Sequence, residues 1–420
     1  MSEAMEPAGG GPLPEPDRWR NTVKLMLCVA LGGVVLGGWS LYGSYQSWQD
    51  REESRTAIRE ACAGLLDPDE VLRLDGGHDR LVRSEVKSRR HLDLKQLPDE
   101  CVLLASYEEN GKSRAGTHFG LKVHEFPQQG LHGLGSGAKP FTRSGEREAG
   151  EDITDRADEP LVAPLGDGSA GSYSGRTVSV NAVCERPVAG VTGYRAYATA
   201  RYGDPTAKDR RALARIARTA AVRAAERKGC ATTPPELPAE LPAQGRTLGP
   251  ADRAEGSCAW YAAFLRDRQD RSRLPDKALG VRSAERSGAE SCLLALDTDT
   301  REGLRDQIAA ERPDSRSLGD FRNNPWWLKT FAYFGDDAAG TGLEPGGSRQ
   351  TGITDGQAGR ALAVRYATAT CQGRRAVLGM EAHYEYERFL GARLDEAFTA
   401  YATATAARRG CTGLVLPGPE

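Results

Sequence analysis

The spacing of the cysteines constrains this chain more than any other feature of its sequence. Cys28 lies in an apolar segment near the N-terminus, and eight cysteines follow it. The first four are separated by 39, 83 and 46 residues, and the last four by 34, 79 and 40 residues. The same order of gaps, found twice, is a repeat signature on the scale of a domain. The two sets are Cys62, Cys101, Cys184 and Cys230, and then Cys258, Cys292, Cys371 and Cys411.

Short sequence matches accompany the repeated gaps. Arg227-Lys228-Gly229-Cys230 corresponds to Arg408-Arg409-Gly410-Cys411, and each closes an Ala-rich helical stretch. We therefore expect an α+β fold with two tandem, internally duplicated domains. Their predicted ranges are 46–232 and 257–414, with a Pro-rich linker over 233–256, flexible loops over about 127–175 and 335–359, and a short tail over 415–420.

Hydrophobic periodicity gives the main elements of each half. Apolar residues alternate with polar ones where strands are expected and recur at helical spacing before each Gly-Cys pair. The predicted strands include Phe119–Phe126, Val178–Cys184, Tyr194–Tyr202 and Trp326–Phe334, and the predicted helices include Ala207–Lys228 and Arg388–Arg409.

The segment from Val23 to Tyr45 has the length and polarity of a membrane span. It carries one charge, Lys24, and as a helix it would reach roughly 35 Å, enough to cross a hydrocarbon core of roughly 30 Å. Arg18 and Arg20 precede it, so the positive-inside rule predicts a single-pass protein of the cell membrane. Residues 1–22 would form a disordered cytoplasmic tail, and the bulk of the chain would lie outside.

Two further readings of this segment stay open. A cleaved signal peptide would need small residues at the cleavage site, and Gly38-Trp39-Ser40 matches that pattern only marginally. Gly33 and Gly37 would let two such helices pack closely as a homodimer. Glycine is, however, frequent in membrane helices and in this chain, so the spacing alone does not decide for a dimer.

Outside the membrane, an even number of cysteines favours disulfide bonds over metal ligands or catalytic thiols. The sequence contains no C-x-x-C motif, which argues against a redox site or a zinc ribbon. Four cysteines in each half allow three pairings. We predict that neighbours in the sequence pair, as Cys62–Cys101, Cys184–Cys230, Cys258–Cys292 and Cys371–Cys411.

The stretch Ala61-Cys-Ala-Gly-Leu-Leu-Asp-Pro-Asp-Glu-Val71 resembles the start of domains in uncharacterised single-pass extracytoplasmic membrane proteins of GC-rich actinobacteria. The composition agrees, because only ten of the 56 basic residues are lysines. The resemblance implies a location in the cell envelope. It carries no catalytic residue to this chain.

Two groups of residues are candidates for a binding surface. Arg211, Arg215 and Arg218 lie on a strongly basic predicted helix that could contact an anionic surface, although the arginine-rich composition favours a solvated helix face. Trp326 and Trp327 could form an aromatic ligand surface or belong to a buried strand.

The histidines do not predict a metal site. His118 and His124 share one face of a strand, but roughly 20 Å separates such positions, too far for one zinc ion. We expect both at exposed polar positions. The sequence predicts no metal and no cofactor.

A net charge of −2 and the predicted location argue against a nucleic-acid partner. No catalytic motif is complete, since Ser84-Glu-Val-Lys87 fits S-x-x-K without the motifs that accompany it in serine hydrolases. The sequence favours a non-catalytic binding or scaffold role toward a cell-wall polymer or another envelope protein. The alternative is an extracytoplasmic hydrolase, which should gather a nucleophile or a carboxylate pair in a concave pocket.

Overall fold

The computed structural model describes residues 16–77, 80–83, 91–109, 112–127, 132–135, 139–141, 152–304, 306–307, 310, 324–344 and 351–418. Most of the predicted cytoplasmic tail and the Ser84–Lys87 motif lie outside these ranges. The described chain is a mixed α+β protein with two large antiparallel sheets and one small sheet.

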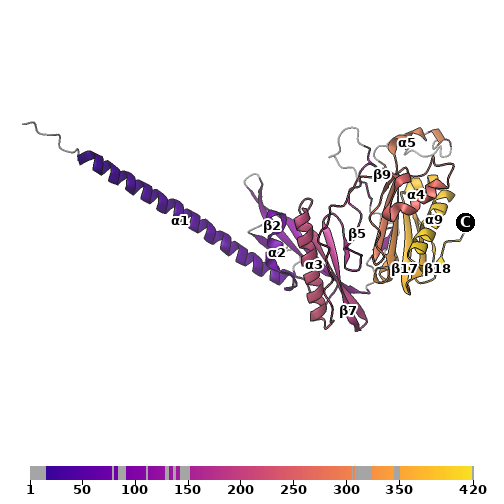
Figure 1. Ribbon diagram of the computed structural model, residues 1–420, viewed down its shortest axis with the longest axis horizontal. Helices are drawn as coiled ribbons and strands as arrows, with labels where there is room; N and C mark the ends of the chain where they lie inside the picture. The colour runs from indigo at the N-terminus through magenta and orange to yellow at the C-terminus, as the bar shows by residue number, and fades with distance from the viewer. Residues whose placement is uncertain are drawn as a thin grey trace, which may run out of the picture.

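A single long helix, α1 (Pro16–Ala61), projects away from the rest of the molecule (Figure 1). Its last turns pack against the first sheet and bury Ile58 and Ala61. Within the part of the chain that the structure describes, no helix is long and apolar enough to cross a membrane. The span from Val23 to Tyr45 therefore stays a prediction from the sequence.

The first sheet has seven strands in the order β1-β2-β3-β8-β7-β6-β5. Helix α3 (Ala207–Arg227) packs on β7 and β8. It begins with a capping box, in which Thr206 and Asp209 each bond the backbone N–H of the other, and it turns an alanine-rich face to the sheet. The strands are β1 (Leu81–Arg83), β2 (Asp99–Glu109), β3 (Lys112–Phe126), β5 (Ala163–Pro164), β6 (Gly171–Tyr173), β7 (Thr177–Val188) and β8 (Val191–Ala200).

The second sheet has eight strands, in the order β15-β16-β17-β12-β11-β10-β9 with β18 paired to β16. Helices α4 (Ala259–Arg266), α8 (Tyr384–Leu390) and α9 (Ala392–Arg408) belong to this half, and Figure 1 shows α4 and α9 at the end of the molecule opposite α1. The strands are β9 (Gly249–Pro250), β10 (Lys277–Leu279), β11 (Ala289–Leu296), β12 (Trp326–Phe334), β15 (Gly359–Ala361), β16 (Val364–Cys371), β17 (Arg374–Ala382) and β18 (Cys411–Val415).

The two sheets face each other. On β8, the even-numbered side chains such as Ala196 pack toward α3, so Arg195 and Tyr197 point the other way, because neighbouring side chains on a strand alternate. On β12, Trp326 and Leu328 pack in the core with α9, which leaves Lys329 on the opposite face. The molecule is therefore layered as α3, first sheet, second sheet, and α4 with α9.

The halves also share a core and a small sheet. Leu293, Ala295 and Trp327 of the second sheet belong to the same buried cluster as the core of the first half. Strand β4 (His132–Leu134) of the first half pairs in parallel with β13 (Thr341–Leu343) of the second, which in turn pairs with β14 (Thr351–Gly352). The two halves are thus joined by backbone hydrogen bonds within the small sheet as well as by apolar contact.

Several segments expected to be loose are ordered. Residues 152–175 include β5 and β6 and bury Ile153, Leu161 and Leu165, and residues 335–344 include α7 (Asp336–Ala339) and β13. These parts were predicted as flexible loops, and in the structure they hold short strands, a helix and buried apolar side chains despite a polar composition. The predicted linker behaves similarly: Leu241 and Leu248 are buried against the first half, so it acts as a strap.

All four predicted disulfides are confirmed, as Cys62–Cys101, Cys184–Cys230, Cys258–Cys292 and Cys371–Cys411. Three of the bonds tie a strand to a residue close to the end of a helix, and Cys371–Cys411 links the paired strands β16 and β18. Because disulfides persist in oxidising compartments, four of them indicate an extracytoplasmic domain.

Candidate functional site

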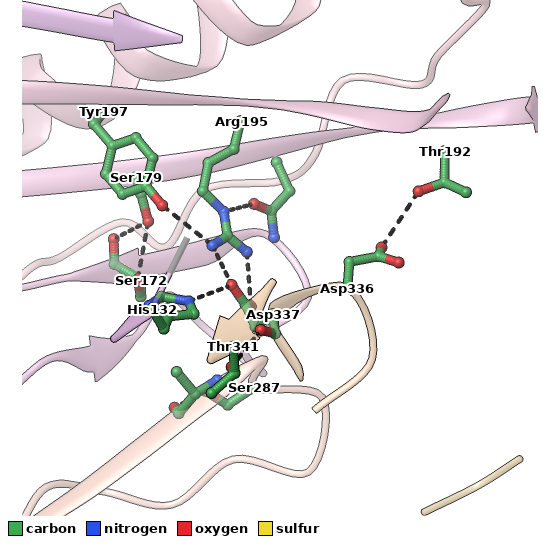
Figure 2. Close-up of polar contacts among 12 residues, drawn as sticks. His132, Ser172, Ser179, Thr192, Arg195, Tyr197, Ser287, Asp336, Asp337 and Thr341 are labelled. Carbon is green, nitrogen blue, oxygen red and sulfur yellow. Dashed lines mark hydrogen bonds and ion pairs between the residues drawn. The ribbon is translucent and has the colours of Figure 1, made fainter. Parts of the chain in front are cut away.

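An ion pair buried between the two sheets is the centre of the candidate site. Arg195 extends from β8, and Asp337 lies on α7, just after Gly335 turns the chain away from β12 with a φ of 61°. The guanidinium donates two hydrogen bonds to the carboxylate, from Nη1 to Oδ1 at 2.6 Å and from Nη2 to Oδ2 at 2.9 Å. Figure 2 shows the two side chains meeting between the halves.

Arg195 donates two further hydrogen bonds within the cluster. Its Nε donates to Asn181 Oδ1 at 2.6 Å, Nη1 also reaches the Tyr197 hydroxyl at 3.3 Å, and its guanidinium carbon lies 4.6 Å from the centre of the Phe126 ring. Burial alone would raise the pKa of Asp337, but Arg195 and His132 together hold that pKa well below its usual range. Both groups of the pair are therefore fixed in their charged forms.

His132 completes the cluster from β4. Its Nε2 lies 3.0 Å from Asp337 Oδ1, and its ring stacks on Tyr333 with the ring centres 4.2 Å apart. Burial raises the pKa of the Tyr333 hydroxyl, so that group stays a neutral phenol. The Thr341 hydroxyl donates to the Asp337 carbonyl at 2.8 Å, which braces α7 (Figure 2).

The cluster borders a cavity of about 200 Å³ between the sheets. The first sheet contributes Asn181 and Tyr197 to its wall, and the second contributes Lys329, Phe331 and Tyr333. A further cavity of about 370 Å³ also has Arg195 and Asp337 in its wall, so the ion pair borders both spaces.

The acidic groups of the smaller cavity are unsuited to acid–base chemistry. Glu290 accepts two hydrogen bonds from Arg408, at 3.1 and 2.6 Å, and Asp337 is held in the same bidentate manner by Arg195. In such bidentate pairs the oxygen lone pairs of the carboxylate are engaged by the guanidinium. The Ser287 hydroxyl donates to the Ala289 carbonyl at 2.6 Å and is not aligned with a base. The geometry fits binding better than catalysis.

A second charged cluster joins the halves and resembles a cation site. Oxygen atoms of Asp152, Asp155 and Asp297 lie within 4.8 Å of one another, but the ammonium of Lys277 already sits among them. Its Nζ lies 3.2 Å from Asp152 Oδ2 and 2.6 Å from Asp155 Oδ1, and it also contacts Asp297. Although burial opposes the charge, these carboxylates raise the pKa of Lys277. This cluster is a structural crosslink with its own cation.

A wide hollow of about 1600 Å³ lies on the outer helical side of the second half. Its charged side chains neutralise one another: Arg365 pairs with Glu387 and, at 3.1 Å, with Asp395, which also binds Arg360. The remainder of its wall consists largely of alanine and threonine side chains of α9. This wide groove presents no concentrated binding chemistry.

The basic residues predicted as an anionic contact lie on the outer face of α3. Arg211 is exposed, Arg218 is half-buried, and Arg215 Nε donates to Glu70 Oε1 at 2.8 Å. Farther along α3, Arg223 and Arg227 donate to backbone carbonyls of the segment after α1. Part of the basic stripe therefore holds α3 to its neighbours, and its contact with an anionic surface stays a prediction.

Of the two readings of Trp326 and Trp327, the structure supports the buried strand and not an aromatic ligand surface. Trp326 and Trp327 are only 3% and 4% exposed. Trp326 stacks on Tyr386 in the core, and Trp327 joins the core shared by the two sheets. The expectation that His118 and His124 are exposed is wrong: both are buried, His118 against Tyr202 and His124 against Tyr197.

The sequence reasoning missed Arg195, Asp337 and Lys329. Arg195 and Lys329 each occupy a single charged position within a strand rich in aromatic or alanine residues, which is a usable signal for a buried charge. Comparison of the chain with protein-family models, with curated proteins and with solved structures finds no match. The function must therefore be argued from the site itself.

Proposed function

We propose that this chain is a single-pass, membrane-anchored envelope protein whose extracytoplasmic part is a non-catalytic binding module. The cavity between the two sheets is the observation that carries the proposal. Its two carboxylates, Asp337 and Glu290, are each held by two hydrogen bonds from an arginine, so neither carboxylate is free to act as a general acid or base. A cell-wall polymer or another envelope protein would then meet the rigid two-sheet body from outside.

The sequence and the exposed side chains of α1 support the anchor. The helix runs through the whole apolar segment from Val23 to Tyr45, and Leu25, Met26 and Val29 are 67%, 68% and 69% exposed. Such side chains on an isolated helix are stable in lipid rather than in water. The N-terminus would face the cytoplasm, and Gly33 with Gly37 would allow two anchors to pack as a homodimer.

The arrangement of the two halves supports an origin by internal duplication. The central strands follow the order β2-β3-β8-β7 in one sheet and β11-β12-β17-β16 in the other. The disulfides fall on corresponding strands, since β2 and β11 each carry the second cysteine of its half and β7 and β16 the third. A long helix, α3 or α9, ends just before the last cysteine in both halves.

Topology and thiol chemistry test the location. The full chain with a C-terminal tag should sediment with membranes from an actinobacterial host, and protease added to intact protoplasts should remove the tag. After denaturation without reductant, a maleimide–polyethylene glycol reagent should add once, to Cys28, and it should add nine times after reduction. The matched variant Cys28→Ser should show no adduct before reduction. A protected tag, or several free thiols before reduction, would refute the envelope location.

The hydrolase alternative is tested separately. A fluorophosphonate probe labels an activated serine, and we expect no labelling of the folded chain. Of the three serines that line the cavity, Ser287 donates to a carbonyl and Ser172 bonds Ser179 at 2.9 Å. Labelling that is lost on denaturation would show a nucleophile and overturn the non-catalytic assignment.

A further inference from the structure

Lys329 is the unusual group in the wall of the intersheet cavity. It lies in the middle of β12 on the face turned to the first sheet, and its Nζ sits 5.0 Å from the centre of the Phe331 ring. Phe331 and Tyr333 follow on the same face with nearly parallel rings, at 11°, and His132 stacks on Tyr333. The cavity thus has an ammonium at one point of an aromatic wall.

Among the residues that the structure describes, this ammonium lacks the carboxylate contact that Arg195 and Arg408 have. Within the described ranges, Lys329 makes neither a hydrogen bond nor an ion pair, whereas Arg195 and Arg408 are each bound to a carboxylate. Glu381 is its partner in the strand register, on β17, and attracts it from a distance. Burial nevertheless lowers the pKa of Lys329, which reflects a charge poorly compensated by the protein.

We propose that the intersheet cavity binds a small carboxylate-bearing molecule, with the Lys329 ammonium as its charge partner and the Phe331 and Tyr333 rings as its apolar wall. The inference rests on the proposed binding function and names its ligand class. An anion at this point supplies the missing partner of a desolvated cation, and a desolvated pair of this kind is strong because water does not compete for it.

The size and the charge of the cavity select this ligand class. An apolar protein cavity of about 150 Å³ holds benzene, so about 200 Å³ has room for one ring with a carboxylate. A single ammonium matches a monoanion. Phosphate is typically bound by arginine forks, and here the guanidiniums of Arg195 and Arg408 are occupied by Asp337 and Glu290.

Calorimetric titration of the full chain in detergent with benzoate tests the proposal. We expect saturable binding, at least tenfold weaker binding to Lys329→Met, and unchanged binding to Lys208→Met, which removes an exposed lysine at the start of α3. Benzamide, the neutral isostere, should bind at least tenfold more weakly than benzoate, and inorganic phosphate at equal ionic strength should not displace benzoate. A thermal unfolding midpoint of Lys329→Met at or above that of the parent shows that the variant is folded.

Three results would contradict the proposed carboxylate site. Absence of benzoate binding by the folded parent, equal binding by parent and Lys329→Met, or displacement by phosphate would each overturn the carboxylate site. None of these results alters the thiol count, the protease accessibility or the fluorophosphonate result, which test the proposed function. A failure of the ligand assignment and a failure of the envelope-binding function therefore appear in different measurements.

Discussion

Replacing Asp337 by asparagine isolates the energetic link between the two halves. The substitution keeps the size of the side chain but removes the charge that faces the Arg195 guanidinium at 2.6 and 2.9 Å. Two charges about 4 Å apart attract by about 4 kcal/mol at an effective dielectric constant of about 20. Removing one partner of a buried pair typically costs about 3–5 kcal/mol. Since asparagine still accepts one hydrogen bond, we expect a loss of about 3 kcal/mol.

A double-mutant cycle separates this interaction from other effects of the substitution. Asp337→Asn, Arg195→Met and the double variant are compared by urea unfolding, followed by tryptophan fluorescence, because Trp327 lies in the core shared by the sheets. The double variant should be more stable than the sum of the two losses predicts, with a coupling energy of about 2–3 kcal/mol. A coupling below about 0.5 kcal/mol would refute the reasoning.

A matched control exists on the same interface. Arg286 also reaches across to the first half, where its Nη1 lies 3.2 Å from Asp167 Oδ2, but its side chain is 72% exposed. Solvent-screened pairs contribute little, so Arg286→Met should cost no more than about 0.5–1 kcal/mol. A loss as large as that of Asp337→Asn would mean that burial is not what gives the Arg195–Asp337 pair its weight.

The pH dependence of stability has a defined sign. The folded-state pKa of Asp337 lies below its value in the unfolded chain, about 3.9. Its contribution is therefore complete above about pH 4 and is lost as the pH falls toward the folded value. Asp337→Asn should lose less stability on acidification than the parent over this range, and parallel curves would contradict the assignment.

Three further variants probe other contacts of the body. Lys277→Met leaves three carboxylates facing one another, and it should lower the free energy of unfolding by about 1–3 kcal/mol at pH 7. The pKa of Lys277 is raised in the folded chain, so the stabilisation by this lysine should be lost only above about pH 10.4. Alkaline unfolding of the parent measures this loss. Gly288→Ala places a Cβ 2.0 Å from Asp337 Oδ2, so urea unfolding should show a loss of about 1–3 kcal/mol. Removing both Cys184 and Cys230 by serine should cost about 2–5 kcal/mol, measured against the reduced and oxidised parent.

The helices and strands could be predicted from the sequence because the patterns that indicate them lie within each element. The alternation of Trp326–Phe334 predicts β12 with its observed bounds, and the alanine-rich periodicity before Gly229 predicts α3 to within one residue. The disulfides were also accessible, since each bond joins cysteines 34 to 46 residues apart that are neighbours in the sequence order. Neighbour pairing within a compact half leaves few alternatives.

The order of the segments predicted as loops could not be predicted from the sequence, for a physical reason. Residues 152–175 are polar and glycine-rich, and such a composition predicts a disordered segment. Their order depends on partners distant in sequence: Asp152 accepts hydrogen bonds from Thr298, and Gly168 approaches Ser287 so closely that a Cβ would lie 2.5 Å from the Ser287 nitrogen. Neither contact leaves a trace in the local pattern.

The candidate site was missed because polar alternation has two physical meanings. Ser179, Asn181, Arg195 and Tyr197 occupy the positions of β7 and β8 that a single-sheet reading assigns to solvent. In the structure a second sheet covers that face, and its own strand β12 contributes Lys329 opposite them. A polar sheet face covered by another polar face becomes a buried site with paired charges. The sequence pattern of a single strand is the same whether its polar face is covered in this way or exposed to solvent. The signal that could distinguish the two cases is an arginine between apolar neighbours in a strand, as at Arg195. Its partner, Asp337, lies 142 residues away in the sequence, so the pattern of the strand alone does not identify it.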